Sequence, residues 1–180
     1  MKLTRAFICV EFSDGVIREV ARVQELLDKK FIGKFTELEN LHLTLKFLGE
    51  IDEDRIVEVK KRLGEIKLKE FEGKLHSLGT FSHKGNPRII WIKITGREMV
   101  ELQKQIDIAL KDLFKSEERF MSHLTIARVK HVSDKKYFFE CLKNIHVKKV
   151  KFKISSFKLK SSELRRLGPV YEMIDEYKFD

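Results

Sequence analysis

The sequence has only two cysteines, no apolar stretch long enough to cross a membrane and no low-complexity segment among its 180 residues. Cys9 and Cys141 lie in apolar stretches without the spacing of a metal site or a disulfide framework, so we expect both thiols to be reduced and buried. The first apolar run is soon interrupted by Glu11 and Asp14, which is too early for a signal peptide. These absences favour a cytoplasmic protein that does not bind membranes.

Apolar and charged side chains are both plentiful. Hydrophobic residues make up 42% of the chain and include fourteen Phe, enough to form the core of one domain or of two closely packed lobes. The net charge of +9 attracts polyanions, of which RNA and DNA are the most common. A surface rich in both Lys and Glu is also typical of ion-pair networks in proteins that work at high temperature. The charge is therefore compatible with a nucleic-acid partner but does not require one.

Hydrophobic periodicity predicts one order of elements twice: strand, helix, strand, helix, strand. The predicted ranges in the first half are 3–12, 13–30, 41–48, 52–66 and 71–81, and those in the second half are 88–95, 98–114, a strand beginning at His123, 133–142 and 147–159, with a final strand over 170–179. An internal duplication with approximate halves 1–83 and 84–180 explains this order. We expect the loop over 79–87 to join two lobes or to form a flap over the cleft between them.

A repeated tetrapeptide is the most informative pattern. His-Leu-Thr-Leu begins at His42 and returns as His-Leu-Thr-Ile at His123, a coincidence of roughly one in two thousand in a chain of this composition. Residues two apart on a strand project to the same side, so each His shares a face with its Thr, Thr44 or Thr125. One neutral and one protonated imidazole supply a general base and a general acid near pH 7, and Thr hydroxyls donate to phosphoryl oxygens. The pattern predicts metal-free chemistry on a phosphodiester.

Two other interpretations remain open for these histidines. A single histidine on a strand usually forms a hydrogen bond inside the fold, but this explanation loses weight when the motif is doubled. A zinc site needs more ligands than two imidazoles, and no Asp, Glu or Cys lies at regular spacing beside either motif. The four histidines without a matched partner are expected on the surface or in loops: His76, His83, His131 and His146.

The chain resembles the 2H phosphoesterase superfamily, specifically the RNA 2′,3′-cyclic phosphodiesterase family, also known as 2′-5′ RNA ligase. Besides the two tetrapeptides, the matching landmarks are Arg5-Ala6-Phe7, Asn40-Leu41, Lys46 to Glu50, Pro87-Arg88 with Trp91, Ala127-Arg128 and Gly168 to Tyr171. The resemblance implies an α+β fold of two lobes around a central cleft and hydrolysis of a 2′,3′-cyclic phosphate to a 2′-phosphomonoester. It also implies that His42 is the proton donor and His123 the proton acceptor. Ser122 departs from the pattern, because a proline is common before the second motif.

Three further residues are candidates for substrate binding. Phe47 and Arg128 each follow a motif histidine by five residues. Strict alternation places both on the face opposite the histidines, but a bulge or twist can bring them to the cleft, where a ring and a guanidinium can sandwich a base. Core packing is an equal alternative for Phe47. Lys46 falls on the histidine face and is expected to attract phosphate or to be solvated.

We therefore predict one bilobal α+β domain over 1–180, made of two pseudo-twofold-related lobes, each an antiparallel sheet with helices outside. The expected enzyme is a monomer without a metal or cofactor that hydrolyses RNA 2′,3′-cyclic phosphate ends or cyclic nucleotides. Ligation of a cyclic phosphate end to a 5′-hydroxyl end is the alternative reaction, because the same two histidines can act in reverse. A non-catalytic RNA-end or nucleotide binder is the alternative of another class.

Overall fold

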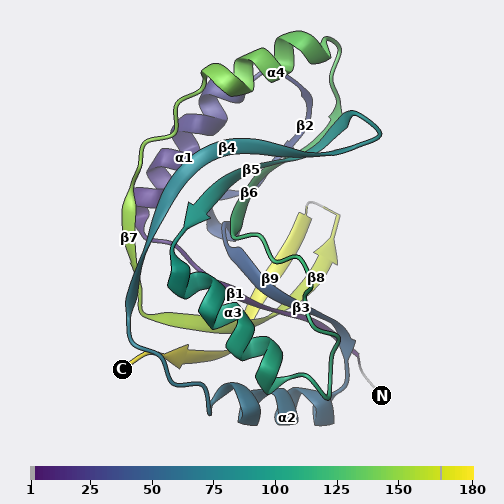
Figure 1. Cartoon of the computed structure of the whole chain (residues 1–180). Helices are drawn as coiled ribbons and strands as arrows, with labels where there is room; N and C mark the ends of the chain where they lie inside the picture. Colours follow the sequence, from purple (N-terminus) through teal and green to yellow (C-terminus); the bar gives the residue numbers. More distant parts are fainter. Residues whose placement is uncertain (1–2, 167) are drawn as a thin grey trace.

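Two antiparallel sheets, each with two helices packed on it, form two lobes in the computed structural model, which describes residues 3–166 and 168–180 (Figure 1). Sheet A has the spatial order β3 (Leu43–Ile51), β1 (Thr4–Val10), β8 (Ser156–Arg165) and β9 (Gly168–Lys178). Sheet B has the order β2 (Ile32–Phe35), β6 (His123–His131), β5 (Asn86–Thr95), β4 (Phe71–His83) and β7 (Lys151–Ile154). The predicted α+β class is confirmed.

The helices are α1 (Asp14–Leu27), α2 (Glu53–Leu63), α3 (Arg97–Ala109) and α4 (Lys135–Asn144), with a single 3₁₀ turn, η1 (Leu38–Asn40). The side chains of Asp52 and Asp134 accept hydrogen bonds from the backbone at the starts of α2 and α4, which explains why those two helices begin where the sequence predicts. β2 and η1 were not predicted from the sequence, because both are too short for a periodic pattern.

The first helix in each half of the chain packs on the sheet of the other lobe. α1 follows β1 of sheet A but packs against β6 and β7 of sheet B, whereas α3 follows β5 of sheet B and packs against β3 of sheet A. In both repeats the motif strand pairs antiparallel with the strand that precedes the helix, β3 with β1 and β6 with β5. Each sheet consequently contains strands from both halves of the chain, and one continuous apolar core spans the two lobes.

Two expectations about connections are wrong, that the loop over 79–87 joins the lobes and that 147–159 is one strand, whereas the alternative of a flap at 79–87 stays a prediction. The segment 79–87 does not join the lobes: it is the end of a hairpin within sheet B, closed by Lys84 and Gly85, whose φ angles of 48° and 72° suit the tight turn between two twisted strands. The strand expected over 147–159 is two strands, β7 in sheet B and β8 in sheet A, separated at Ser155. The chain passes from sheet B to sheet A there, as it also does between β2 and β3, and it passes from sheet A to sheet B between β1 and β2 and between β3 and β4. No helix among the described residues is both long and apolar enough for a membrane span.

Candidate active site

The two motif histidines are held by the same hydrogen bond. Nδ1 of His42 lies 2.7 Å from the carbonyl oxygen of Asn40, and Nδ1 of His123 lies 2.7 Å from that of Met121. A carbonyl oxygen only accepts, so each Nδ1 carries the hydrogen and donates it. Both neutral rings therefore have the same tautomer, with Nε2 as the nitrogen that can take up a proton. The same nitrogen, Nε2, can therefore act as the general acid in one histidine and as the general base in the other.

A β-bulge at the fourth residue of the first motif changes which side chains share the face of Thr44. Along β1, Cys9 pairs with Thr44 and Ile8 pairs with Lys46, so Leu45 is the extra residue in β3. Phe47 pairs with Phe7, which is on the same side of β1 as Cys9. The bulge thus puts Phe47 on the face of Thr44 and turns Lys46 to the opposite face.

The second motif contains the matching bulge at Ile126. Trp91 of β5 pairs with Thr125, and Ile89 pairs with Arg128, so the extra residue again follows the threonine. Trp91 and Ile89 share one side of β5, which places Arg128 on the face of Thr125. The carbonyl of Ile126 accepts from the backbone N–H of Thr36 at 2.9 Å and from Nε2 of Gln24 at 3.0 Å. These bonds hold the bulge in place.

Lys46 does not lie on the histidine face, and its assignment to substrate binding is wrong. Its side chain is buried, and Nζ donates to Oδ1 of Asp107 at 2.5 Å and to the carbonyl of Lys115 at 2.7 Å. Asp107 also accepts from Nε2 of Gln103 and from the backbone N–H of Glu117. Burial alone would raise the pKa of Asp107, but these hydrogen bonds, first that of Lys46, outweigh burial and lower it. Lys46 instead ties β3 to α3.

Aromatic rings surround His42. Its ring centroid is 4.9 Å from that of Phe7 and 5.3 Å from that of Tyr171, which it meets edge to face at 89°. Phe47 lies 6.3 Å from Phe7 and remains 67% exposed, so its ring is open to a ligand instead of packed in the core. The alternative of core packing for Phe47 is therefore wrong.

Aromatic rings also lie beside His123. Phe81 is edge-on at 5.1 Å, and Trp91 is 6.4 Å away. The indole of Trp91 crosses Gly79 so closely that a Cβ there would lie 2.3 Å from the ring, which explains the glycine. Phe7, Trp91 and Tyr171 occur among the landmarks of the family resemblance, whereas no sequence signal pointed to Phe81.

Burial is the main cause that lowers the pKa of His42. The hydrogen bond to Asn40 and the charge of Glu11 oppose this effect, and the positive charges of Lys160 and Arg128 add to it. Glu11 itself accepts hydrogen bonds from Lys158 and Lys160 of β8. In the free protein His42 is therefore biased toward the neutral imidazole.

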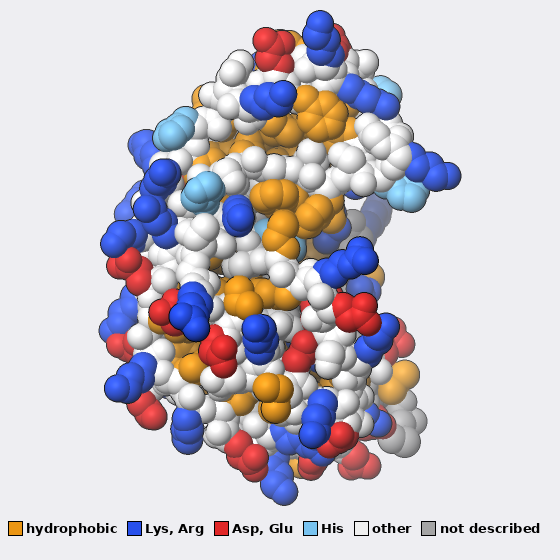
Figure 2. Space-filling model, in the orientation of Figure 1, with side chains coloured by type: hydrophobic (Ala, Val, Ile, Leu, Met, Phe, Trp, Pro, Cys, Tyr) orange, Lys and Arg blue, Asp and Glu red, His pale blue; other side chains and the backbone are white. Residues whose placement is uncertain are grey.

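The two motif strands approach each other where the lobes meet. Cα atoms of β3 and β6 come within 8 Å across the boundary, and the surface is hollowed between the lobes (Figure 2). The other four histidines, at positions 76, 83, 131 and 146, are exposed. Among residues 3–166 and 168–180, no three or more His, Cys, Asp or Glu side chains are grouped to hold a metal ion. The structure therefore contains two motif-strand faces, each with one His and one Thr.

Comparisons with known proteins place these features in a family. The model of the LigT-like phosphoesterase family matches residues 10–91 and 93–171, and each segment contains one motif. A curated relative named RNA 2′,3′-cyclic phosphodiesterase from Methanocaldococcus jannaschii is 36% identical over 96% of this chain and 99% of its own length. One of the same name from Aquifex aeolicus is 35% identical over 98% of each chain.

Solved structures show the same fold. The crystal structure of TT0787 from Thermus thermophilus has a TM-score of 0.80 at 25% identity and covers 97% of both chains. Escherichia coli LigT in its apo form has a TM-score of 0.79 at 18% identity and covers 99% of both. This chain and these proteins therefore share the same fold.

Proposed function

Because this chain belongs to the LigT-like phosphoesterase family, we propose that it hydrolyses RNA 2′,3′-cyclic phosphate ends to 2′-phosphomonoesters. The curated relatives that carry the name RNA 2′,3′-cyclic phosphodiesterase match nearly the whole chain. The observation that carries the proposal is the matched pair of bulged strands, each with a His fixed by a carbonyl and a Thr on the same face. Such a pair suits in-line displacement at one phosphorus.

In the proposed reaction, Nε2 of His123 removes a proton from water as the water oxygen attacks phosphorus. The bond from phosphorus to O3′ breaks, and Nε2 of His42 gives its proton to the departing O3′, which leaves the phosphate on O2′. Thr44 and Thr125 donate to the non-bridging oxygens, where negative charge increases in the transition state. Two imidazoles thus account for both proton transfers, so the mechanism does not require a metal ion.

His42 can act as the proton donor only if binding of the substrate favours the protonated form of its ring. Burial favours the neutral ring in the free protein, but a phosphodiester within hydrogen-bond reach carries a negative charge that favours the imidazolium. His42 then takes up its proton as the substrate binds. In this proposal Phe47 stacks on the base and Arg128 pairs with phosphate.

Single alanine variants test the proposal. His42→Ala and His123→Ala should each lower turnover of a 2′,3′-cyclic nucleotide by about 10²- to 10⁴-fold while the circular dichroism spectrum stays unchanged. His131→Ala is the matched control, because this exposed histidine ends the same strand β6. If either motif variant keeps more than about a tenth of the wild-type rate, the two-histidine mechanism is wrong.

A further inference from the structure

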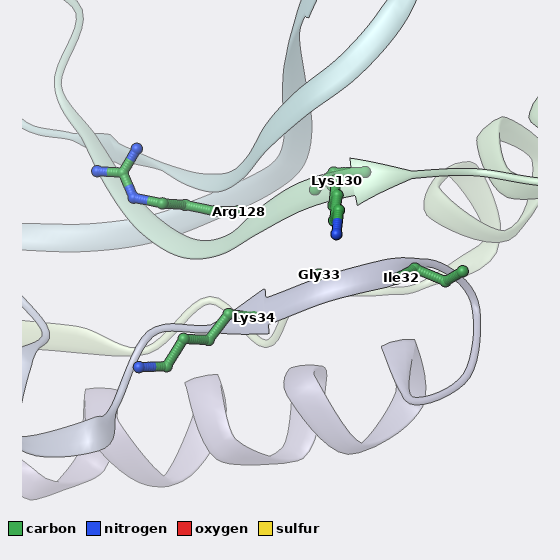
Figure 3. Close-up of a pocket in the computed structure, with 6 residues that line it drawn as sticks. Ile32, Gly33, Lys34, Arg128 and Lys130 are labelled. Carbon is green, nitrogen blue, oxygen red and sulfur yellow. The ribbon is translucent and has the colours of Figure 1, made fainter. Parts of the chain in front are cut away.

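A groove lies between the edge strand β2 and the motif strand β6. It is a shallow hollow of about 380 Å³ that is open to solvent. Its lining residues are Ile32, Gly33, Lys34, Arg128, Val129 and Lys130, here called the β2–β6 groove. The ionisable side chains among them are Lys34, Arg128 and Lys130, and Lys34 also forms an ion pair with Glu37. Figure 3 shows the side chains of Arg128 and Lys34 extending in the same direction from neighbouring strands, away from Lys130.

The β2–β6 groove shares Arg128 with the candidate active site. Lys34 pairs with Arg128 across the two strands, so the two side chains share a face of sheet B. Because of the bulge at Ile126, Thr125 lies on that same face of sheet B. Burial and then the charge of Lys160 lower the pKa of His42 in the other lobe, and the charge of Arg128 adds a smaller effect of the same sign. The cations of the groove therefore continue from the site of chemistry along the sheet.

A glycine in β2 lets this strand lie close to β6 along the groove. A Cβ at Gly33 would lie 2.2 Å from the carbonyl oxygen of Arg128 and 2.8 Å from the ring of Phe31, so only glycine lets β2 approach so closely. Ile32 is 59% exposed at the start of this edge strand. An exposed apolar side chain beside three cations suits a ligand that presents both bases and phosphates.

The chemistry of the proposed substrate identifies the occupant. A cyclic mononucleotide has only the phosphate that reacts, whereas an RNA end brings one further negative charge for each preceding nucleotide. A row of Lys and Arg that leads away from the reacting phosphate matches the second kind of substrate by charge. Building on the proposed function, we propose that the β2–β6 groove binds the RNA chain preceding the cyclic phosphate, which makes oligonucleotides better substrates than mononucleotides.

Kinetics on substrates of two lengths test this inference. The pair is a cyclic mononucleotide and a tetranucleotide that ends in the same nucleotide and cyclic phosphate. The wild type should have the higher kcat/KM on the tetranucleotide. Lys130→Glu should lower that value about 3- to 10-fold and leave kcat/KM on the mononucleotide unchanged. Lys61→Glu on α2 is the control, because it makes the same charge change on an exposed lysine at the other end of the molecule (Figure 1).

Equal wild-type kcat/KM on the two lengths, or an equal loss on both in Lys130→Glu, would overturn the inference while leaving the proposed function intact. Failure of the wild type to hydrolyse either substrate would instead contradict the proposed function. Binding then gives an independent measurement, from the anisotropy of a tetranucleotide labelled at its 5′ end. Lys130→Glu should weaken this binding and reduce its slope against log salt by about 0.7, whereas Lys61→Glu should not. The groove is not an RNA site if both variants bind the tetranucleotide equally well. It is also not an RNA site if Lys130→Glu weakens the binding of poly-glutamate but not that of RNA.

Discussion

Replacement of Phe47 by alanine tests whether the bulge at Leu45 serves ligand binding. The ring is 67% exposed, so only about a third of the roughly 150 to 250 Å² of a Phe side chain is buried, and the free energy of unfolding should fall by about 1 to 2 kcal/mol. Stacking of one base on an aromatic ring contributes about 1 to 3 kcal/mol, which corresponds to an increase in KM of roughly 5- to 150-fold. The protein therefore stays folded while it loses affinity.

The assay measures KM and kcat for a 2′,3′-cyclic nucleotide in Phe47→Ala and in Ile108→Ala. Ile108 lies on α3 and is 68% exposed, so it controls for the loss of an equally exposed apolar side chain. The expected result is a higher KM in Phe47→Ala with little change in kcat, and wild-type values in Ile108→Ala. A wild-type KM in Phe47→Ala, or the same increase in both variants, would refute the stacking role.

Three further changes test other parts of the site. Lys46→Met should lower the free energy of unfolding in urea by about 2 to 4 kcal/mol, because it leaves the Asp107 carboxylate without its cation; adding Asp107→Leu should recover part of this loss, and wild-type stability in Lys46→Met would contradict the structure. In NMR titrations, His42 should titrate below the ordinary value of about 6.5 in the free protein and at higher pH when inorganic phosphate is bound, and a midpoint unaffected by phosphate would argue against its role as donor. Thr44→Ala and Thr125→Ala should each lower kcat by about 10- to 10³-fold, and an unchanged kcat in either variant would remove that hydroxyl from the mechanism.

The elements that the sequence predicted are those with a long and regular pattern. Most apolar residues of α1 recur at helical spacing and are buried, and the duplicated motif predicted the strands β3 and β6. Helix boundaries were less accurate: the helix expected to end at Phe114 ends at Ala109, because periodic apolar residues continue into the loop that follows. A periodic pattern reports which residues are buried more reliably than where a helix stops.

The sequence could not predict features that depend on pairing between distant strands. The bulges at Leu45 and Ile126 follow from the registers of β3 with β1 and of β6 with β5, and nothing local to either motif indicates them. Strict alternation consequently placed Lys46 on the histidine face, whereas Phe47 and Arg128 were candidates for the site only if a bulge or twist turned them to it. The crossing of α1 and α3 between lobes is likewise a property of packing, because an amphipathic helix shows which side is buried but not which sheet covers it.

The central claim is that this chain opens a 2′,3′-cyclic phosphate by hydrolysis with two histidines and no metal. Its most direct test is ³¹P NMR of a 2′,3′-cyclic nucleotide incubated with the protein in excess chelator, with His42→Ala and His123→Ala as parallel samples. We expect complete conversion to the 2′-phosphomonoester by the wild type and almost none by either variant. A 3′-phosphomonoester as product, or turnover that appears only when a divalent ion is added back, would contradict it.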